Sequence, residues 1–270
     1  MLKSSYTSSS ILALDIDASS RVAVLSLNRV EGRNAFSKSM LQDFKGVMAS
    51  LLEMEGSISS LIIKSDVDKV FCAGADLKER LQMPENEVGP FVSSFRDTLQ
   101  SLATLPFPTI AAMEGVALGG GLEVALACDM RIAGQRAKMG LPEVALAIIP
   151  GAGGTQRLSR IVGVAKAKEL VFTSKIVTSD EALAIGLINE CVPSGQAYTR
   201  AMEIANSMAT TKGPLGLRMA KQAIDRGIEV DMEQGLQIEK DCYEQVIYTN
   251  DRKEGLKAFT EKRPPCYTGS

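Results

Sequence analysis

The stretch that decides the fold is residues 116–128, Val-Ala-Leu-Gly-Gly-Gly-Leu-Glu-Val-Ala-Leu-Ala-Cys. Three consecutive glycines allow a tight turn, and the Ala-rich run that follows is typical of a buried helix. Glu123 interrupts this run, although a glutamate is rarely buried unless it is paired or used in chemistry. Glu143, twenty residues later, follows Leu-Pro and precedes a second apolar run. Two such carboxylates beside a glycine turn predict an acid/base pair next to a backbone anion site.

Each glutamate also has a purely structural interpretation. Glu123 is then a core carboxylate paired with an arginine such as Arg131, and Glu143 is a helix-start or loop carboxylate that faces water. The glycines are then explained by close packing and tight turns alone. Because both glutamates occur together with the glycines in a chain without histidine, the catalytic interpretation is favoured.

The composition excludes several classes of chemistry. The chain has 270 residues, 45% of them hydrophobic, and a formal net charge of −2, which indicates a substantial core and no polyanion partner. It contains no histidine, so Ser-His-Asp and Cys-His nucleophiles and His-based zinc sites are excluded. The five cysteines form no CxxC pair, which indicates a reducing compartment and no metal site. No apolar run reaches the roughly 18 residues that cross a bilayer, so no membrane association is expected.

Strands that alternate with helices predict an α/β core over residues 10–194, and a mainly helical pattern follows over residues 195–270. The expected strands cover residues 21–27, 59–63, 109–113 and 130–133, and the expected helices begin near Ser37, Leu77, Pro90, Leu122 and Met232. Ser37 is a candidate N-cap, and Thr178 with Glu181 has capping-box spacing.

Two turns join the end of a strand to the start of a helix. They lie in residues 71–78, which contain Ala73-Gly74-Ala75-Asp76, and in residues 117–123 with the triple glycine. Free N–H groups at such turns attract negative charge, and two of them from separate turns would hold one developing oxyanion. Neither turn has the ending of a phosphate-binding loop or GxGxxG spacing, so nucleotide hydrolysis and dinucleotide binding are disfavoured.

These segments resemble the motifs of the crotonase (enoyl-CoA hydratase/isomerase) superfamily and occur in the family's order. The motifs lie in residues 72–80, 110–115, 119–123, 127–129, 140–143, 149–158 and 258–263. The resemblance extends over about residues 22–267. It is closest to the methylglutaconyl-CoA hydratase subgroup, whose members include an AU-rich-element RNA-binding hydratase.

The resemblance implies a spiral of ββα turns, followed by a C-terminal helical region that mediates oligomerisation. It implies an acyl-CoA thioester substrate, with coenzyme A as part of that substrate and no separate cofactor. The N–H groups of Ala75 and Gly120 would form the oxyanion hole for the thioester oxygen. Glu123 would mainly activate water and Glu143 would mainly protonate the α-carbon, so that water adds syn across the α,β double bond. Gly151 would position the water.

The resemblance also implies contacts to the CoA moiety. Arg33 and Lys78 would meet its phosphates, and Ala73 and Leu77 would line the adenine pocket. Asp76 belongs to the same binding segment. The resemblance further implies homotrimers or dimers of trimers, in which Phe259 and Lys262 would reach the CoA site of a neighbouring subunit.

Both glutamates favour a hydratase, a hydro-lyase acting on a short or branched-chain enoyl-CoA, with 3-methylglutaconyl-CoA as a candidate. An enoyl-CoA isomerase is the alternative, but moving one proton requires only one base. An RNA-binding homologue is disfavoured because residues 37–56 hold only Lys38 and Lys45 against three acidic residues. A catalytically inactive assembly partner is disfavoured because both glutamates and both glycine turns are present.

The resemblance places the reaction in fatty-acid or branched-chain amino-acid degradation, in the mitochondrial matrix, or in the cytoplasm of a bacterium. The first ten residues are Ser-rich and contain no acidic residue. They fit either the end of an organelle transit peptide or a disordered terminus.

Overall fold

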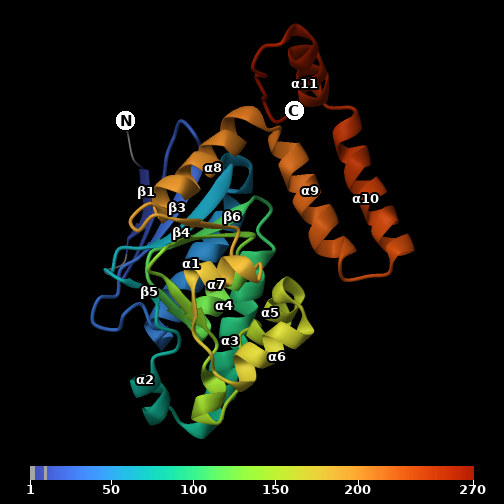
Figure 1. Ribbon diagram of the computed structural model, residues 1–270. Coiled ribbons are helices and arrows are strands. Elements are labelled where there is room, and N and C mark those ends of the chain that lie inside the picture. Colours follow the sequence, from blue (N-terminus) through green and yellow to red (C-terminus); the bar gives the residue numbers. More distant parts are fainter. Residues whose placement is uncertain (1–3, 9–10) are drawn as a thin grey trace.

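Two sheets form the centre of the molecule in a computed structural model that describes residues 4–8 and 11–270 (Figure 1). The larger sheet has the strand order β1-β2-β3-β4-β6-β8-β11, and the smaller has the order β10-β9-β7-β5. The strands are β1 (Ser4–Ser8), β2 (Leu12–Ile16), β3 (Val22–Leu27), β4 (Ser60–Ser65), β5 (Val70–Cys72), β6 (Thr109–Met113), β7 (Val116–Leu118), β8 (Met130–Gly134), β9 (Lys138–Gly140), β10 (Val177–Thr178) and β11 (Glu190–Val192).

The helices lie against both sheets and form the C-terminal part. They are α1 (Lys38–Glu53), α2 (Leu77–Gln82), α3 (Glu85–Ala103), α4 (Gly120–Ala127), α5 (Gly154–Val162), α6 (Val164–Phe172), α7 (Ser179–Ala184), α8 (Ala197–Thr211), α9 (Pro214–Gly227), α10 (Met232–Ile247) and α11 (Asn250–Glu261), with 3-10 helices η1 (Glu55–Ser57) and η2 (Glu143–Leu146).

Successive strand pairs wind the chain into a spiral. Each of the pairs β4–β5, β6–β7 and β8–β9 places its first strand in the larger sheet and its second in the smaller. Within each sheet these strands pair in parallel, so their carboxyl ends face the same way. The α/β class and the spiral of ββα turns are therefore present as expected.

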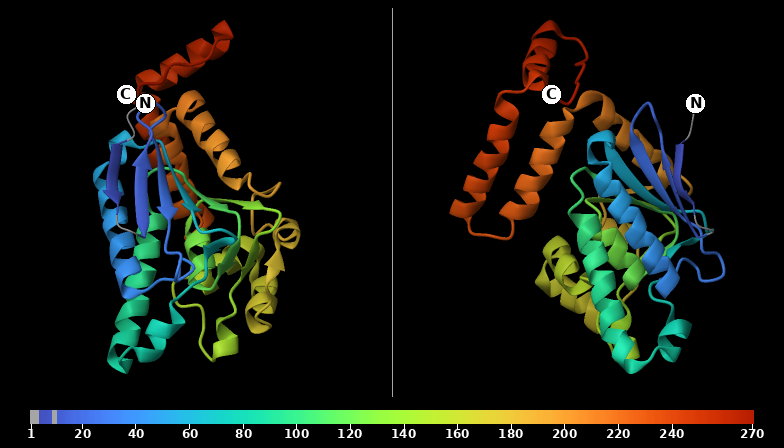
Figure 2. Two further views of the ribbon diagram at one scale, coloured as in Figure 1. Left: turned by 90° about the vertical axis from the view of Figure 1, so that its left-hand side faces the viewer. Right: turned by 180° about the vertical axis from the view of Figure 1, so that it is seen from behind.

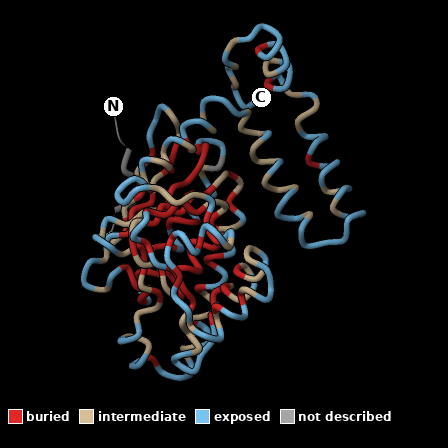
Figure 3. Tube along the Cα trace, in the orientation of Figure 1, coloured by how far each residue is buried: buried red, intermediate tan, exposed pale blue. Residues whose placement is uncertain are grey.

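The core lies between the sheets and helices α1, α3 and α4, where the buried residues are concentrated in Figure 3. β6 is buried along its whole length, as expected for a parallel strand covered on both faces. The triple glycine allows α4 to pack very closely on β5. A Cβ atom built on Gly121 would lie only 2.1 Å from Cys72 O.

The C-terminal helices divide into one that packs on the sheet and three that extend from it. Ala197, Ala201 and Ala205 of α8 are buried against the larger sheet. Helices α9 and α10 lie side by side and stand away from the sheets with α11 beyond them, as Figures 1 and 2 show. Lys221 of α9 joins this arm to the core through a 2.8 Å ion pair with Asp129. The division at residues 194 and 195 stays a prediction.

Most expected elements are confirmed, and two expectations are wrong. Ser37 caps α1 by accepting the Met40 N–H, and the Thr178–Glu181 capping box is formed. Helix α3, however, begins at Glu85, so Pro90 lies inside it rather than in its first turn. Pro90 is exposed and removes only one intrahelical hydrogen bond, while acidic residues in the first turn favour the earlier start.

The second correction concerns the N-terminus. β1 pairs with β2 in antiparallel orientation, so residues 4–8 belong to the sheet rather than to a disordered terminus. Residues 1–3 and 9–10 of the expected transit-peptide or disordered segment lie outside the described residues. Among the described helices, none combines the length and the apolar character needed to cross a bilayer.

Candidate active site

Glu123 is buried in α4 and held by a loop from a distant part of the chain. The residue is only 3% exposed to solvent. Its Oε1 atom accepts hydrogen bonds from Ala152 N at 2.8 Å and Gly154 N at 2.7 Å, both in the 150–154 loop. Two N–H donors stabilise the ionised form of a carboxylate in surroundings that otherwise disfavour charge.

The interpretation of Glu123 as the partner of Arg131 is wrong. The Arg131 guanidinium instead donates to the backbone carbonyls of Leu187 and Cys128, at 2.8 and 2.7 Å. These carbonyls satisfy a buried arginine without a carboxylate, so Glu123 is not committed to a core ion pair.

Glu143 has different surroundings. It is the first residue of η2, directly after Pro142, and is half-buried. Its Oε2 atom is buried and has no hydrogen-bond partner among the described residues, so the interpretation as a carboxylate facing water is wrong. The other oxygen lies beside the triple-glycine turn, because a Cβ atom on Gly119 would be 3.2 Å from Glu143 Oε1.

The two carboxylates influence each other electrostatically. Burial raises the pKa of Glu143 to about 7, and the charge of Glu123 adds to that rise. Burial also raises the pKa of Glu123, but the N–H groups of Gly154 and Ala152 and the charges of Arg157 and Arg96 oppose the rise. The site therefore contains two neighbouring acids in unequal environments, a pattern that separates an acid from a base.

The two predicted oxyanion donors lie on neighbouring segments. Ala75 forms an isolated parallel bridge with Phe36, in which Phe36 N donates to Gly74 O and Asp76 N donates to Phe36 O. In such a bridge the N–H of Ala75 points away from Phe36. Gly120 is the first residue of α4, so no carbonyl of that helix can accept its N–H.

The segments of Ala75 and Gly120 are in close contact. A Cβ atom on Gly74 would lie 3.3 Å from Gly120 N, and one on Gly120 would lie 2.8 Å from the Phe95 ring. Two N–H groups without an intrasegment acceptor thus come together beside an aromatic ring, an arrangement suited to a carbonyl oxygen that gains negative charge.

The residues predicted to contact CoA fall into two groups. Arg33, in the loop before α1, is adjacent to Ala73, because Ala73 N donates to Arg33 O at 3.1 Å. The Arg33 side chain is exposed, and so are Leu77 and Lys78 at the start of α2. The carboxylate of Asp76 is already used. It caps α2 and forms a 2.7 Å ion pair with Arg29, so within the chain it shapes the segment.

Phe259 and Lys262 lie in the C-terminal arm, at and just after the end of α11. Phe259 is 86% exposed, and α11 stands far from α4 and η2 in Figures 1 and 2. The structure therefore does not bring these two residues to the glutamates of the same chain, and their contact with a neighbouring subunit stays a prediction.

Sequence reasoning missed two arginines near Glu123. Arg96 of α3 donates to Gly151 O at 2.9 Å, and Arg157 of α5 donates to Ala152 O at 3.1 Å. Arg157 was visible only as part of a glycine-rich motif. Arg96 gave no signal, since a single arginine on the polar face of an amphipathic helix is ordinary.

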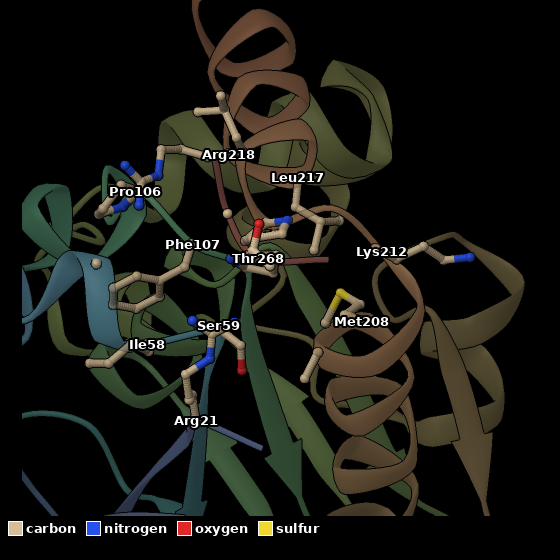
Figure 4. A pocket seen from close by; sticks show the side chains of 16 residues that line it. Arg21, Ile58, Ser59, Pro106, Phe107, Met208, Lys212, Leu217, Arg218 and Thr268 are labelled. Atoms are coloured by element: carbon tan, nitrogen blue, oxygen red, sulfur yellow. The ribbon is translucent and has the colours of Figure 1, made fainter. Parts of the chain in front are cut away.

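A cavity of about 270 Å³, shown in Figure 4, lies in a different part of the molecule. Its lining comes from residues that precede β3, β4 and β6 and from the corner between α8 and α9, including Arg21, Ser59, Pro108, Met208, Lys212 and Arg218. Neither glutamate lines it. In the part of the chain that the structure describes, no group of three His, Cys, Asp or Glu side chains is placed to hold a metal ion.

The chain is similar to known proteins of one family. The sequence profile described as enoyl-CoA hydratase/isomerase matches residues 17–270. The chain is 50% identical over 252 residues to the mitochondrial methylglutaconyl-CoA hydratase of Mus musculus, covering 92% of the chain and 80% of the relative. It is 50% identical over 251 residues to the probable enoyl-CoA hydratase 2 of Arabidopsis thaliana, covering 93% and 83%.

The chain is also similar to a solved structure. The crystal structure of enoyl-CoA hydratase from Bacillus anthracis matches with a TM-score of 0.91 and 46% identity, covering 95% of this chain and 99% of that one. These similarities confirm the resemblance to the crotonase superfamily and its fold. The chain belongs to the enoyl-CoA hydratase/isomerase family.

Proposed function

We propose that the protein is an enoyl-CoA hydratase that adds water across the α,β double bond of an acyl-CoA thioester. The observation that carries the proposal is the pair Glu123 and Glu143, two neighbouring carboxylates. One is held by two N–H donors, and the other has a buried oxygen without a hydrogen-bond partner in the described part of the chain. Hydration needs both a base for water and an acid for the α-carbon.

The unequal surroundings assign the roles. Glu123 is the base, because its N–H donors and the nearby arginines favour the ionised form. Glu143 is the acid, because a pKa of about 7 leaves a substantial fraction of it protonated near neutral pH. The active pair thus shares one proton, and its titration belongs to both residues.

The proton and the electrons then balance over one turnover. Glu123 takes a proton from water as the water oxygen bonds to the β-carbon. The π electrons move toward the thioester, and the N–H groups of Ala75 and Gly120 stabilise the oxygen as it gains enolate character. Glu143 gives its proton to the α-carbon, so the pair still holds one proton, now on Glu123. Proton exchange with solvent, lost from Glu123 and gained by Glu143, restores the starting state. Syn addition follows because both carboxylates act from one face of the substrate, with Gly151 positioning the water.

The alternative reaction, enoyl-CoA isomerisation, uses only part of this apparatus. Moving a double bond requires one group to remove and return a proton, which leaves Glu123 and the donors of its carboxylate unexplained. A second acid/base group is therefore the feature that favours hydration.

The proposed substrate is a short or branched-chain enoyl-CoA, with 3-methylglutaconyl-CoA as the first candidate. The support is the 50% identity to proteins named methylglutaconyl-CoA hydratase. The CoA moiety is assigned to Arg33, Ala73, Asp76, Leu77 and Lys78, with Asp76 acting as the cap that orders the segment. RNA is not a proposed ligand, since Lys38 is already paired with Glu87.

The proposed assembly is a homotrimer or a dimer of trimers. Large apolar side chains are exposed along the C-terminal arm, including Ile224, Ile228, Met232, Tyr248 and Phe259. An apolar surface of this kind is typical of a protein interface. In such an assembly Phe259 and Lys262 would complete a neighbour's CoA site. The names of the mammalian and plant relatives support a mitochondrial location, and a relative from Bacillus subtilis makes the bacterial cytoplasm the alternative.

The test is a panel of kcat/KM values for crotonyl-, tiglyl-, 3-methylcrotonyl- and 3-methylglutaconyl-CoA, followed by loss of the conjugated enoyl thioester absorbance. We expect hydration of at least one short substrate and the highest kcat/KM for a branched one. The proposed hydratase would be refuted if the wild-type protein is folded and binds CoA but hydrates neither crotonyl-CoA nor 3-methylglutaconyl-CoA.

A further inference from the structure

One peptide group connects an arginine on α3 with the carboxylate of Glu123. Arg96 Nε donates to Gly151 O at 2.9 Å, and Ala152 N donates to Glu123 Oε1 at 2.8 Å. The Gly151 carbonyl and the Ala152 N–H belong to the same peptide unit. Hydrogen bonds at the two ends of a peptide strengthen each other, because each polarises the group between them.

We propose that Arg96 is a positioning residue that orients the Gly151–Ala152 peptide and strengthens its hydrogen bond to the Glu123 carboxylate. The inference rests on the proposed function in one respect, namely that Glu123 works as a base. Arg96 itself is not assigned a contact with substrate. It acts through the peptide, and its charge lies close enough to favour the ionised form of Glu123.

The packing of α3 on the 150–154 loop supports this role. Val92 and Arg96 are four residues apart and lie on the same face of the helix. A Cβ atom on Gly151 would come within 2.7 Å of Val92 Cγ1, so a glycine at this position allows the close approach. That approach brings the Arg96 guanidinium to the Gly151 carbonyl, although the rest of the Arg96 side chain is exposed.

The charged groups around Glu123 come from several elements. Arg96 lies on α3 and Arg157 on α5, and both oppose the rise in the pKa of Glu123 that burial causes. Glu143 on η2 is the coupled acid. On β8, Arg131 donates to carbonyls at the other end of α4, and burial raises the pKa of the Cys72 thiol on β5 to about 12, which keeps it neutral.

Arg96 can be tested separately from Arg157. Arg157 is half-buried and also donates to Leu99 O and Gln100 Oε1, so its removal would disturb the packing of α3 and α5. Arg96 is exposed, and Gly151 O is its hydrogen-bond acceptor among the described residues. Its replacement should leave the fold intact.

The experiment compares wild type with Arg96→Met, Arg96→Lys and the control Arg136→Met. Arg136 is an exposed arginine in the loop between β8 and β9. The kcat/KM value for the best substrate of the panel is measured from pH 5 to pH 9, with circular dichroism and thermal unfolding as checks of the fold.

We expect Arg96→Met to move the acidic limb of the profile to higher pH. Each unit of such a shift lowers kcat/KM about tenfold at the acidic end, so we expect a loss of roughly three- to tenfold near pH 5.5 and a smaller loss at pH 8. Arg96→Lys should restore part of the shift, because it keeps the charge but not the planar Nε donor. Arg136→Met should match wild type.

A loss of activity that is equal at every pH, or no loss at all, would overturn the proposal. A second measurement tests the role of Arg96 without relying on enzyme activity. The ¹³C carboxyl signal of Glu123, assigned by its disappearance in Glu123→Gln, should titrate at higher pH in Arg96→Met than in wild type. If the wild type shows no hydratase activity but this NMR shift occurs, the proposed function fails while the role of Arg96 stands. If the signal titrates identically in both proteins, the role of Arg96 is refuted.

Discussion

Two regions of the site differ in the hydrogen-bond donors that they offer to a carboxylate. They are the 150–154 loop around Glu123 and the 3-10 helix η2 around Glu143. The loop supplies two N–H donors to one oxygen of Glu123, and arginines hold the other side of the same loop. η2 leaves one oxygen of Glu143 buried without a partner in the described structure. The same residue type thus receives groups that favour its ionised form in one region and receives no such donor in the described part of the other.

This contrast has a chemical and a thermodynamic side. Chemically, it separates a base from an acid without histidine, using only burial, hydrogen bonds and charge. Thermodynamically, an unpartnered buried oxygen lowers stability, and functional sites commonly contain such features. Experiments that exchange or remove the two environments test both sides.

The largest expected effect is on the chemical step itself. Glu123→Gln and Glu143→Gln should each lower kcat for hydration by roughly 10²- to 10⁴-fold, the usual range for loss of a general acid or base. The double variant should lose much less than the product of the two single losses, because the residues act as one unit. Steady-state and single-turnover kinetics measure these values.

Binding provides the control for this prediction. Both single variants should bind acyl-CoA with nearly unchanged Kd, since the amide has the size of the carboxylate and the proposed CoA contacts are elsewhere. If one glutamine variant retained near-wild-type hydration, the division into acid and base would be wrong, and a single-base mechanism would replace it.

The next effect concerns the N–H donors between the two regions. Gly120→Pro removes an N–H at the first position of α4, where proline suits the helix. Gly120→Ala is the matched control, because it keeps the N–H but introduces the same Cβ contact with Phe95. We expect the kcat of the proline variant to be roughly 100- to 1000-fold lower than that of the alanine variant. Equal rates would show that Gly120 N does not stabilise the transition state.

Particular residues show how much of this site the sequence predicts. Glu123 stands out because it interrupts an apolar helix, and the N-terminal turn of that helix follows from three glycines. Local sequence patterns also predict the strands β6 and β8 and the caps of α1 and α7. Such features depend on a few residues close together in the sequence.

Other features depend on contacts between distant segments. The donors to Glu123 lie about thirty residues away in a loop, and Arg96 reaches that loop from α3 across 55 positions of sequence. No local pattern specifies such contacts. The predicted start of α3 is also wrong, because a proline in a helical pattern normally marks a helix boundary. Pro90 is instead tolerated inside the helix at an exposed position.

A smaller effect is the pH dependence of the pair. The active form holds one proton, so kcat/KM should follow a bell-shaped curve whose basic limb falls above about pH 7, where Glu143 loses its proton. Hydration consumes no net proton, so the reverse dehydration should show the same curve. Measuring both directions with one substrate pair checks this. A flat profile between pH 6 and pH 9 would contradict the shared proton.

The smallest expected effect is on stability. Burial raises the pKa of Glu143 in the folded state to about 7, so the folded state binds the proton more tightly than the unfolded chain does. Its contribution to stability is therefore complete below the unfolded pKa and is lost as the pH rises through about 7. Glu143→Gln mimics the protonated form and should raise Tm at pH 8.5 by roughly 1–4 °C, with a smaller difference at pH 5. Thermal unfolding at both pH values measures this, with the exposed Glu31→Gln as the control that should show no such trend. If Glu143→Gln gave the same Tm difference at pH 5 and pH 8.5, the unpartnered carboxylate would carry no stability cost, and the contrast between η2 and the 150–154 loop would be chemical only.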